Sequence, residues 1–208
     1  MVYTLFVVIK KYKQEVGVIS DIITFLNGTL INRLEEDDSH NSKVFTIYDQ
    51  YMLAYDSGEF QKTFHETKKI QLSIPHNARI VKTGDIIINM MTGDCVRVSP
   101  ENAGSILPYN YTLIKINQDR VDADYLVYWM NHSPHAKSQF NQFMQGGSLV
   151  KKLTLNQLKQ LEINLPSIER QQLIGKLAVK RQKIKYLHDK KTYLMDKYLS
   201  ESLLREEN

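Results

Sequence analysis

The chain has 208 residues, 42% of them hydrophobic and 24% charged, so it can bury one sizeable core and has the composition of a folded water-soluble protein. Its single cysteine excludes an internal disulfide framework and a multi-cysteine metal site, and fits a reducing cytoplasm. The apolar residues 1–9 are followed by Lys10 and Lys11 and are too few to span a bilayer. We therefore expect a buried strand there, and a cytoplasmic protein without a membrane partner.

The formal net charge of +4 is unevenly distributed along the chain. Of the 27 basic and 23 acidic residues, 10 and 6 lie from Ile168 onward, which leaves 17 of each kind before it. A face that binds anions on the N-terminal part must therefore come from local clusters of basic residues.

Short apolar runs between turn signals predict a series of strands in the first half of the chain. Residues 16–25 predict a short strand or the start of a helix, followed by a turn at Asn27 and Gly28, and residues 33–43 predict an exposed acidic loop. Further strands are expected at residues 43–48, 70–74, 95–98 and 111–116, and as a strand, a Gly-Asp turn and a strand over 78–89.

The next stretch predicts helices with recognisable caps. Asp124 caps a helix over residues 124–130, and Ser133 with Pro134 starts a second helix that runs to Met144.

A capping box follows, in which Thr154 and Gln157 start a short helix through Gln160, before a final strand at residues 162–165. Strands and helices mixed in this order predict an α+β fold.

One long helix is predicted at the C-terminal end. Pro166 cannot lie inside a helix, Ser167 can accept hydrogen bonds from the first free amides, and Glu169 suits the positive end of the helix dipole. About forty residues at ~1.5 Å each give a rod roughly 60 Å long, more than the domain needs to cover its own core. Most of the rod should project and meet a partner.

This helix carries an apolar seam at a spacing of 3.5 residues. Lys180 and Lys191 interrupt the seam at two of its positions. On pattern alone, such a helix is a packing or dimerisation element. The seam residues that we expect to mediate dimerisation are Leu173, Leu177, Ile184, Leu187, Leu194 and Tyr198.

A series of motifs resembles the DNA specificity subunit of type I restriction-modification systems. In order, the motifs lie at residues 17–28, 82–87, 124–126, 145–148, 153–158, 163–166 and 169–174. The resemblance implies a target-recognition domain over residues 1–165 and a spacer helix over 166–208. It also implies double-stranded DNA, a modification (methyltransferase) subunit and a restriction (endonuclease) subunit as partners, and no catalysis by the chain itself.

The resemblance has one departure, because the usual subunit has two recognition domains and two spacer helices and this chain has one of each. If the family's antiparallel helix pairing applies, a second copy must supply the other half. We therefore expect a homodimer that reads a two-part, palindromic target with a fixed gap.

Candidate DNA contacts come from basic pairs, a Gly-Gly-Ser loop and side chains that can pair with base edges. The loops over residues 90–94 and 102–110 are the expected recognition loops, and Arg33 is a further possible base reader. The acidic run over residues 35–38 should face away from DNA, unless it accepts hydrogen bonds from cytosine amino groups. The site candidates are Lys68, Lys69, Arg79, Asn89, Thr92, Arg97, Asn110, Gln145, Gly146, Gly147, Ser148, Lys151 and Lys152.

Two enzymatic functions can be compared with the sequence. Asn110 and Tyr111 lack the prolines of a methyltransferase Asp/Asn-Pro-Pro-Tyr segment, so methyl transfer by this chain is rejected. Asp56, ten residues before Glu66 and Lys68, loosely matches a metal-dependent nuclease pattern in which two carboxylates hold Mg²⁺.

His132 and His135 could share a metal ion, but no cysteine or acidic ligand lies nearby in the sequence. We therefore predict no metal and no cofactor. A protein-interaction module without DNA binding is the non-catalytic alternative.

Overall fold

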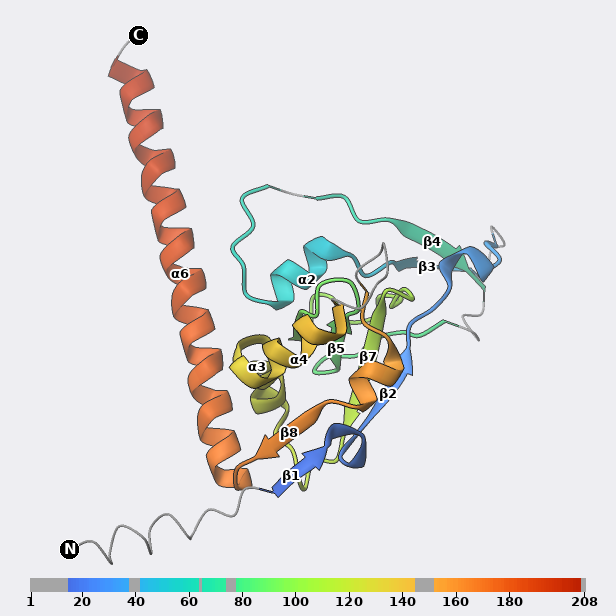
Figure 1. Cartoon of the computed structure of the whole chain (residues 1–208). Helices are drawn as coiled ribbons and strands as arrows, with labels where there is room; N and C mark the ends of the chain where they lie inside the picture. The colour runs from blue at the N-terminus through green and yellow to red at the C-terminus, as the bar shows by residue number, and fades with distance from the viewer. Residues whose placement is uncertain (1–14, 38–41, 64, 74–77, 145–151, 207–208) are drawn as a thin grey trace, which may run out of the picture.

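A four-stranded antiparallel sheet forms the centre of the globular part. The computed structural model describes residues 15–37, 42–63, 65–73, 78–144 and 152–206, and the sheet has the order β2-β7-β5-β6 (Figure 1). The strands pair with Asn27 opposite Thr112, and Ile86 opposite both Ile114 and Arg97. Their bounds are β2 (Ile23–Asn27), β7 (Tyr111–Ile116), β5 (Ile86–Asn89) and β6 (Cys95–Arg97).

Helices cover both faces of this sheet. Side chains alternate along a strand, so Ile86 and Ile88 pack in one cluster with α3 (Ala123–His132) and α4 (Pro134–Met144). Ile87 points to the other face and packs with α2 (Gln50–Asp56). This arrangement explains why all four residues of β5 are buried.

Two smaller sheets and three short helices complete the globular part. β1 (Glu15–Val18) pairs with β8 (Glu162–Leu165), and β3 (Lys43–Thr46) pairs with β4 (Lys69–Leu72), each pair antiparallel. The short helices are η1 (Ile19–Asp21), η2 (Ile31–Arg33) and α5 (Leu155–Lys159).

The predicted α+β class is confirmed, with three local corrections. Residues 78–82 form no strand and contribute only an isolated bridge between Ile80 and Ile106. Asp122, and not Asp124, caps α3 by accepting a hydrogen bond from Tyr125 N. Helix α2 was not predicted. The strand expected over residues 1–9 lies outside the described residues.

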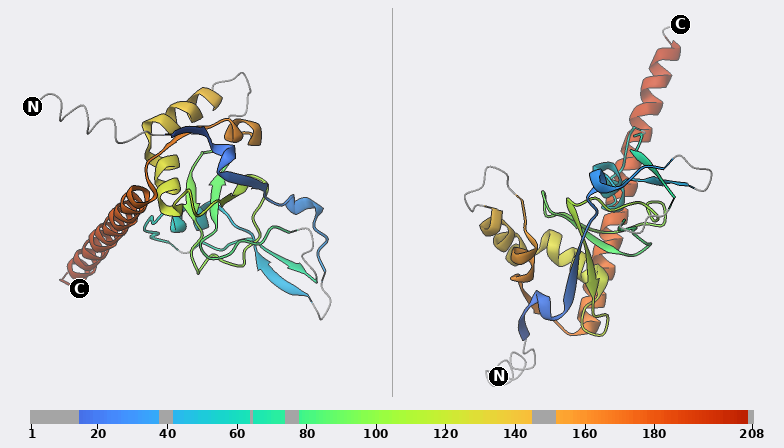
Figure 2. Two further views of the ribbon diagram at one scale, coloured as in Figure 1. Left: turned by 90° about the horizontal axis from the view of Figure 1, so that it is seen from below. Right: turned by 90° about the vertical axis from the view of Figure 1, so that its right-hand side faces the viewer.

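The C-terminal helix α6 (Ile168–Glu206) stands beside the globular part and extends well beyond it (Figures 1 and 2). Its base is fixed by the buried side chain of Gln171, which is 1% exposed. The side-chain amide oxygen of Gln171 accepts a hydrogen bond from Asp122 N. The side-chain amide nitrogen of Gln171 donates to the carbonyl groups of Arg120 and Pro166. One turn later, Gly175 lies so close to the start of α3 that a Cβ there would be 2.7 Å from Asp122 Oδ1.

The predicted seam lies on the opposite face of α6 from these contacts. At 100° per residue, the partly buried positions around Gln171, Gln182 and Tyr193 fall about 180° from the seam. The six seam side chains are 51% to 68% exposed, so the globular part does not cover them. Among the described residues, none of the helices combines the length and the apolar composition of a transmembrane span.

Candidate nucleic-acid interface

Two neighbouring hollows meet at Tyr109, beside one end of the central sheet. The first has a volume of about 690 Å³ and includes Asn27, Gly28 and Lys152 in its lining. The second has a volume of about 790 Å³ and includes Lys68. Tyr109 and Leu30 line both hollows, so the two form one concave face, which we call the Tyr109 face.

The loop that carries Tyr109 is rigidly held although its tip is open. Ile106 and Leu107 before it are fully buried, and their amides donate to the Thr46 and Arg79 carbonyl groups. Tyr109 itself is 56% exposed. A buried anchor with an open aromatic tip presents the ring to a ligand at little cost in side-chain ordering.

Lys152 places its ammonium over this ring. Its Nζ lies 4.6 Å from the ring centroid of Tyr109, a cation–π distance. An ammonium next to an aromatic ring suits a nucleic acid, because the cation can pair with a phosphate while the ring contacts a sugar or a base.

Gly28 allows the end of β2 to approach the Tyr109 loop. A Cβ at this position would overlap the Pro108 carbonyl, and the Gly28 amide donates to the Tyr111 carbonyl. Arg79 lies at the same edge, where its Nε donates a hydrogen bond of 3.1 Å to the Asn27 carbonyl. The turn predicted at Asn27 and Gly28 is not formed, because β2 runs through Asn27 and Thr29 then bridges to Pro108. Gly28 instead leaves room for the backbone of the Tyr109 loop.

The second hollow contains one acidic side chain, Glu36, together with Lys68. The acidic run is expected to face away from DNA unless it accepts hydrogen bonds from cytosine amino groups, and Glu36 of this run lines the second hollow. Lys68 is exposed just before β4 and supplies a cation on this side of Tyr109. The Glu36 carboxylate, beside the Lys68 cation, can accept a hydrogen bond from a cytosine amino group.

Only some of the predicted DNA-contact residues lie on or beside the Tyr109 face. Lys68 and Lys152 line the Tyr109 face, Arg79 lies at its edge, and Asn110 follows Tyr109 with partial exposure. Lys69 and Thr92 are exposed but line neither hollow.

Two candidates are engaged elsewhere. Arg97 pairs with Ile86 at the opposite end of the sheet from Asn27, and its guanidinium bonds Asp124 at 2.7 Å. Asn89 is 3% exposed, donates to Gln50 and accepts from Met91 N, so we remove it from the base-reading set. Gln145, Gly146, Gly147, Ser148 and Lys151 lie outside the described residues.

Sequence reasoning did not single out Tyr109. The residue lies inside the predicted recognition loop over 102–110, but one tyrosine among 12 has no pattern to mark it. The start of the same loop is structural, because Asn102 is buried and donates to the Met52 carbonyl and to Asp56.

The carboxylate of the nuclease alternative is used to hold the fold together. Asp56 Oδ2 accepts from the Tyr48 hydroxyl at 2.7 Å, and Oδ1 accepts from Ser99 N and Asn102 Nδ2. Burial, followed by the nearby Asp56 charge, raises the pKa of Tyr48 far above its usual range, so the phenol stays a donor. With three donors already bound, the Asp56 carboxylate is poorly placed to hold Mg²⁺.

The two histidines contact different aromatic rings. His132 lies against Tyr128, and His135 lies against Trp129. Burial and then the charge of Lys137 lower the pKa of His132. In the described part of the chain, no group of three or more His, Cys, Asp or Glu side chains is arranged to hold a metal ion.

Solved structures share this arrangement of a mixed domain and a long helix. The first is described as "Structural basis underlying complex assembly and conformational transition of the type I R-M system" and matches with a TM-score of 0.61 and 14% identity, over 88% of this chain and 46% of that chain. The HsdS subunit from Thermoanaerobacter tengcongensis matches with a TM-score of 0.58 and 17% identity, over 88% and 46%. The type I restriction-modification S subunit from M. genitalium matches with a TM-score of 0.55 and 10% identity, over 86% and 42%.

The chain therefore has the fold of type I specificity subunits, while its matches span less than half of each of those chains. Residues 12–192 match the family described as the type I restriction modification DNA specificity domain. This is most of the chain, and the chain belongs to that family. A comparison with curated proteins gives no match.

Proposed function

We propose that the chain is a sequence-specific DNA-binding specificity subunit of a type I restriction-modification complex in the cytoplasm. It directs a separate methyltransferase subunit and a separate endonuclease subunit to a bipartite site and performs no catalysis itself. Membership of the specificity family supports this role. In this proposal the recognition domain spans residues 1–165, and the spacer segment, residues 166–208, contains α6.

The observation that carries the proposal is the division of α6 into two faces. One face packs on the chain's own domain, and the other exposes the seam from Leu173 to Tyr198. Exposed large apolar side chains at heptad spacing are stabilised by a second helix. A second copy supplies that helix in a symmetric dimer, and its domain then lies at the far end of the pair.

The Tyr109 face is the proposed DNA contact. Lys152 lies over the ring and Lys68 lines the neighbouring hollow; the two lysines bind phosphates, and Tyr109 contacts a sugar or base. Glu36, Asn27 and Asn32 line the hollows and offer hydrogen-bonding groups for base edges.

Selection from a pool of random duplexes tests sequence recognition. Repeated binding and sequencing should enrich a two-part palindrome with a constant gap. A pool without enrichment, from a chain that still forms a dimer, would leave the protein-interaction module as the better explanation.

Lysine variants then locate the contact on the protein. The double variant Lys68→Ala/Lys152→Ala should weaken binding to all duplexes and reduce the slope of log affinity against log salt by about 2, because each lysine that pairs with a phosphate contributes about 0.9. The matched control is Lys82→Ala/Lys137→Ala, two exposed lysines that line neither hollow. Equal salt slopes for the two double variants would remove the Tyr109 face from the proposal.

Sedimentation tests the dimer independently of DNA. Leu187→Asp places a charge in the middle of the seam and should raise the dimer dissociation constant at least about tenfold. Lys185→Asp, an exposed off-seam position, should leave it nearly unchanged. A wild-type chain that is monomeric at micromolar concentration would contradict the dimer.

A further inference from the structure

The long connection between α2 and β4 makes a second contact with α6, far from its base. Figure 1 shows this connection bulging from α2 toward the long helix before it turns to β4. We call its residues 57–63 the strap. Phe60 lies with its ring centroid 5.8 Å from that of Tyr186 and 5.3 Å from that of Tyr193. Gln182 Nε2 adds a long hydrogen bond of 3.5 Å to the Asp56 carbonyl.

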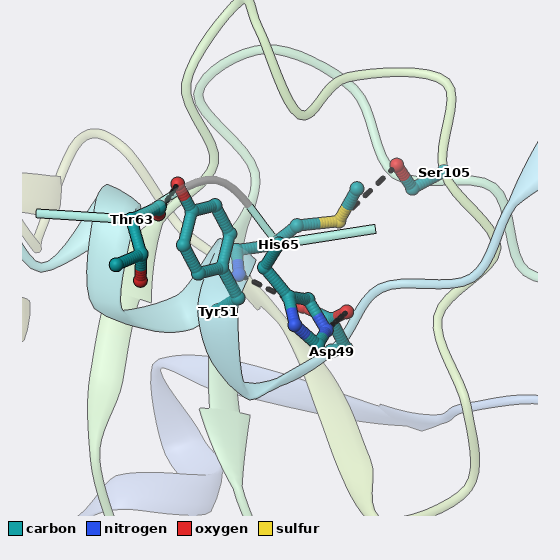
Figure 3. Close-up of polar contacts among 6 residues, drawn as sticks. Asp49, Tyr51, Thr63, His65 and Ser105 are labelled. Carbon is teal, nitrogen blue, oxygen red and sulfur yellow. Dashed lines mark hydrogen bonds and ion pairs between the residues drawn. The ribbon is translucent and has the colours of Figure 1, made fainter. Parts of the chain in front are cut away.

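Both ends of the strap are fixed to the recognition domain. Its start continues from α2, whose Asp56 is bonded to Tyr48. At its end, the Tyr51 hydroxyl donates to the Thr63 carbonyl at 3.1 Å (Figure 3). Just beyond, His65 stacks on Tyr51 at 5.3 Å and lies 3.4 Å from Asp49. The strap is therefore attached to a helix of the core and not only to the rod.

The two contacts on α6 are far enough apart to control its direction. Gln182 and Tyr193 lie 11 and 22 residues beyond Gln171, or roughly 16 and 33 Å along the axis. A helix held only near Gln171 and Gly175 can tilt about that point, whereas a second contact up to ~33 Å away removes this freedom.

Small tilts matter because the rod is long. The C-terminal end of α6 lies about 50 Å beyond Gln171, so a tilt of roughly 10° moves it by about 9 Å. Successive base pairs are separated by ~3.4 Å, and the shift thus corresponds to nearly three base pairs. In a dimer of paired rods, that shift changes the distance between the two recognition faces.

We propose that the strap, through Phe60, fixes the tilt of α6 against the recognition domain and so sets the gap between the half-sites that the dimer accepts. The gap part of this inference rests on the proposed function, and the tilt part does not. Phe60 is a positioning residue, since it contacts the rod on the face opposite the dimerisation seam. Tyr186 and Tyr193 are its partners on α6.

A distance measurement tests the tilt without DNA. Spin labels at Thr83→Cys and Ser200→Cys report the separation of the domain from the distal part of α6, and excess unlabelled chain suppresses signals between protomers. The native Cys95 is fully buried, so it does not take up label. We expect one narrow distance distribution in the wild type and a broader or shifted one in Phe60→Ala. Phe60→Tyr should retain the narrow distribution.

Two further variants keep the test decisive. Val44→Ala removes apolar side-chain atoms at a 62% exposed site on β3, outside the strap and α6, and should change nothing. If Phe60→Ala does not fold, the double variant Tyr186→Ala/Tyr193→Ala removes both ring contacts of Phe60 from the α6 side. An unchanged distance distribution in the folded variants would overturn the strap proposal.

Gap selectivity provides the second readout. With the duplex enriched by selection, we expect the wild type to bind one gap length best and to lose affinity when base pairs are added or removed. Phe60→Ala should bind the altered gaps within a few-fold of the original one. An unaltered gap preference, together with a changed distance distribution, would overturn the link between tilt and gap. Failure to select any duplex would instead count against the proposed function.

Discussion

The base and the distal part of α6 belong to one continuous helix but stabilise the protein in different ways. At the base, a buried amide and a glycine fit the helix against α3. Further along, apolar side chains such as Ile184 and Tyr198 remain 68% exposed. The base is thus a completed intramolecular contact, and the seam on the distal part is an apolar surface that the chain's own domain leaves uncovered.

The difference shows that apolar periodicity alone does not reveal how a long helix attaches to its own domain. The strongest heptad pattern marks the face that the domain leaves open. The attached face is polar or small at its most buried positions, Gln171 and Gly175, and aromatic at Tyr186 and Tyr193. Mutations can therefore separate attachment from assembly.

The largest effect is expected for Gln171→Ala at the base. The substitution leaves Asp122 N and two carbonyl oxygens without their partner in a buried site, and we expect a loss of about 3 kcal/mol of unfolding free energy. Urea unfolding at one protein concentration measures it. Gln172→Ala is the matched control, since the neighbouring glutamine is exposed and should cost less than about 0.5 kcal/mol. Equal losses in the two variants would show that the base is not fixed by this amide.

Gly175→Ala should lower the free energy of unfolding by about 1–2 kcal/mol. The added Cβ would lie 2.8 Å from Tyr125 N, so helix α6 must move away from α3. Helix propensity alone predicts the opposite sign, a gain of about 1 kcal/mol. Thermal unfolding of Gly175→Ala, with Lys176→Ala as the control, decides between the predicted loss and the predicted gain of stability. A stabilised Gly175→Ala variant would mean that the close approach of the helices is not required.

The open seam, much of the fold and part of the site follow from local sequence patterns. Heptad spacing marks the seam, Ser133 with Pro134 marks α4, and Thr154 with Gln157 forms the predicted capping box. These signals act over a few residues and need no tertiary context. Lys68 and Lys152 were found as members of basic pairs.

The attached face, α2 and the tip of the site required the three-dimensional structure. Gln171 resembles a surface residue in sequence, and its burial depends on α3, some fifty residues earlier. Asn89 has the side chain of a base reader, but tertiary packing buries it. The loop of Tyr109 packs its backbone at Pro108 against a glycine eighty residues earlier, Gly28, a contact that local sequence does not reveal.

The two lysines in the seam should weaken dimerisation and help to define its register. The double variant Lys180→Leu/Lys191→Leu completes the apolar stripe, and we expect the dimer to tighten by about tenfold, or roughly 1.4 kcal/mol. Sedimentation over a dilution series measures the dissociation constant. The control Lys185→Leu/Lys190→Leu adds the same apolar groups outside the seam. Tightening by both variants alike would indicate nonspecific association and not a seam.

The smallest effect concerns the first turn of α6. A hydrogen bond from its own backbone amide, and then one from the Ser167 hydroxyl, lower the pKa of Glu169 below its ordinary value of 4.5. A pKa that is lowered in the folded state stabilises the fold at pH values above the pKa of the unfolded state, and this contribution is lost as the pH falls through the folded pKa.

Glu169→Gln should therefore have a slightly lower melting temperature than the wild type at neutral pH. The difference should shrink as the pH falls below 4.5 and vanish once the pH is below the lowered pKa of the folded state, because both side chains are then uncharged. A difference that persists in acid would point to lost packing and not to charge at the positive end of the helix dipole. Because Glu169 is exposed, the effect belongs to the helix start alone and should leave the dimer dissociation constant unchanged.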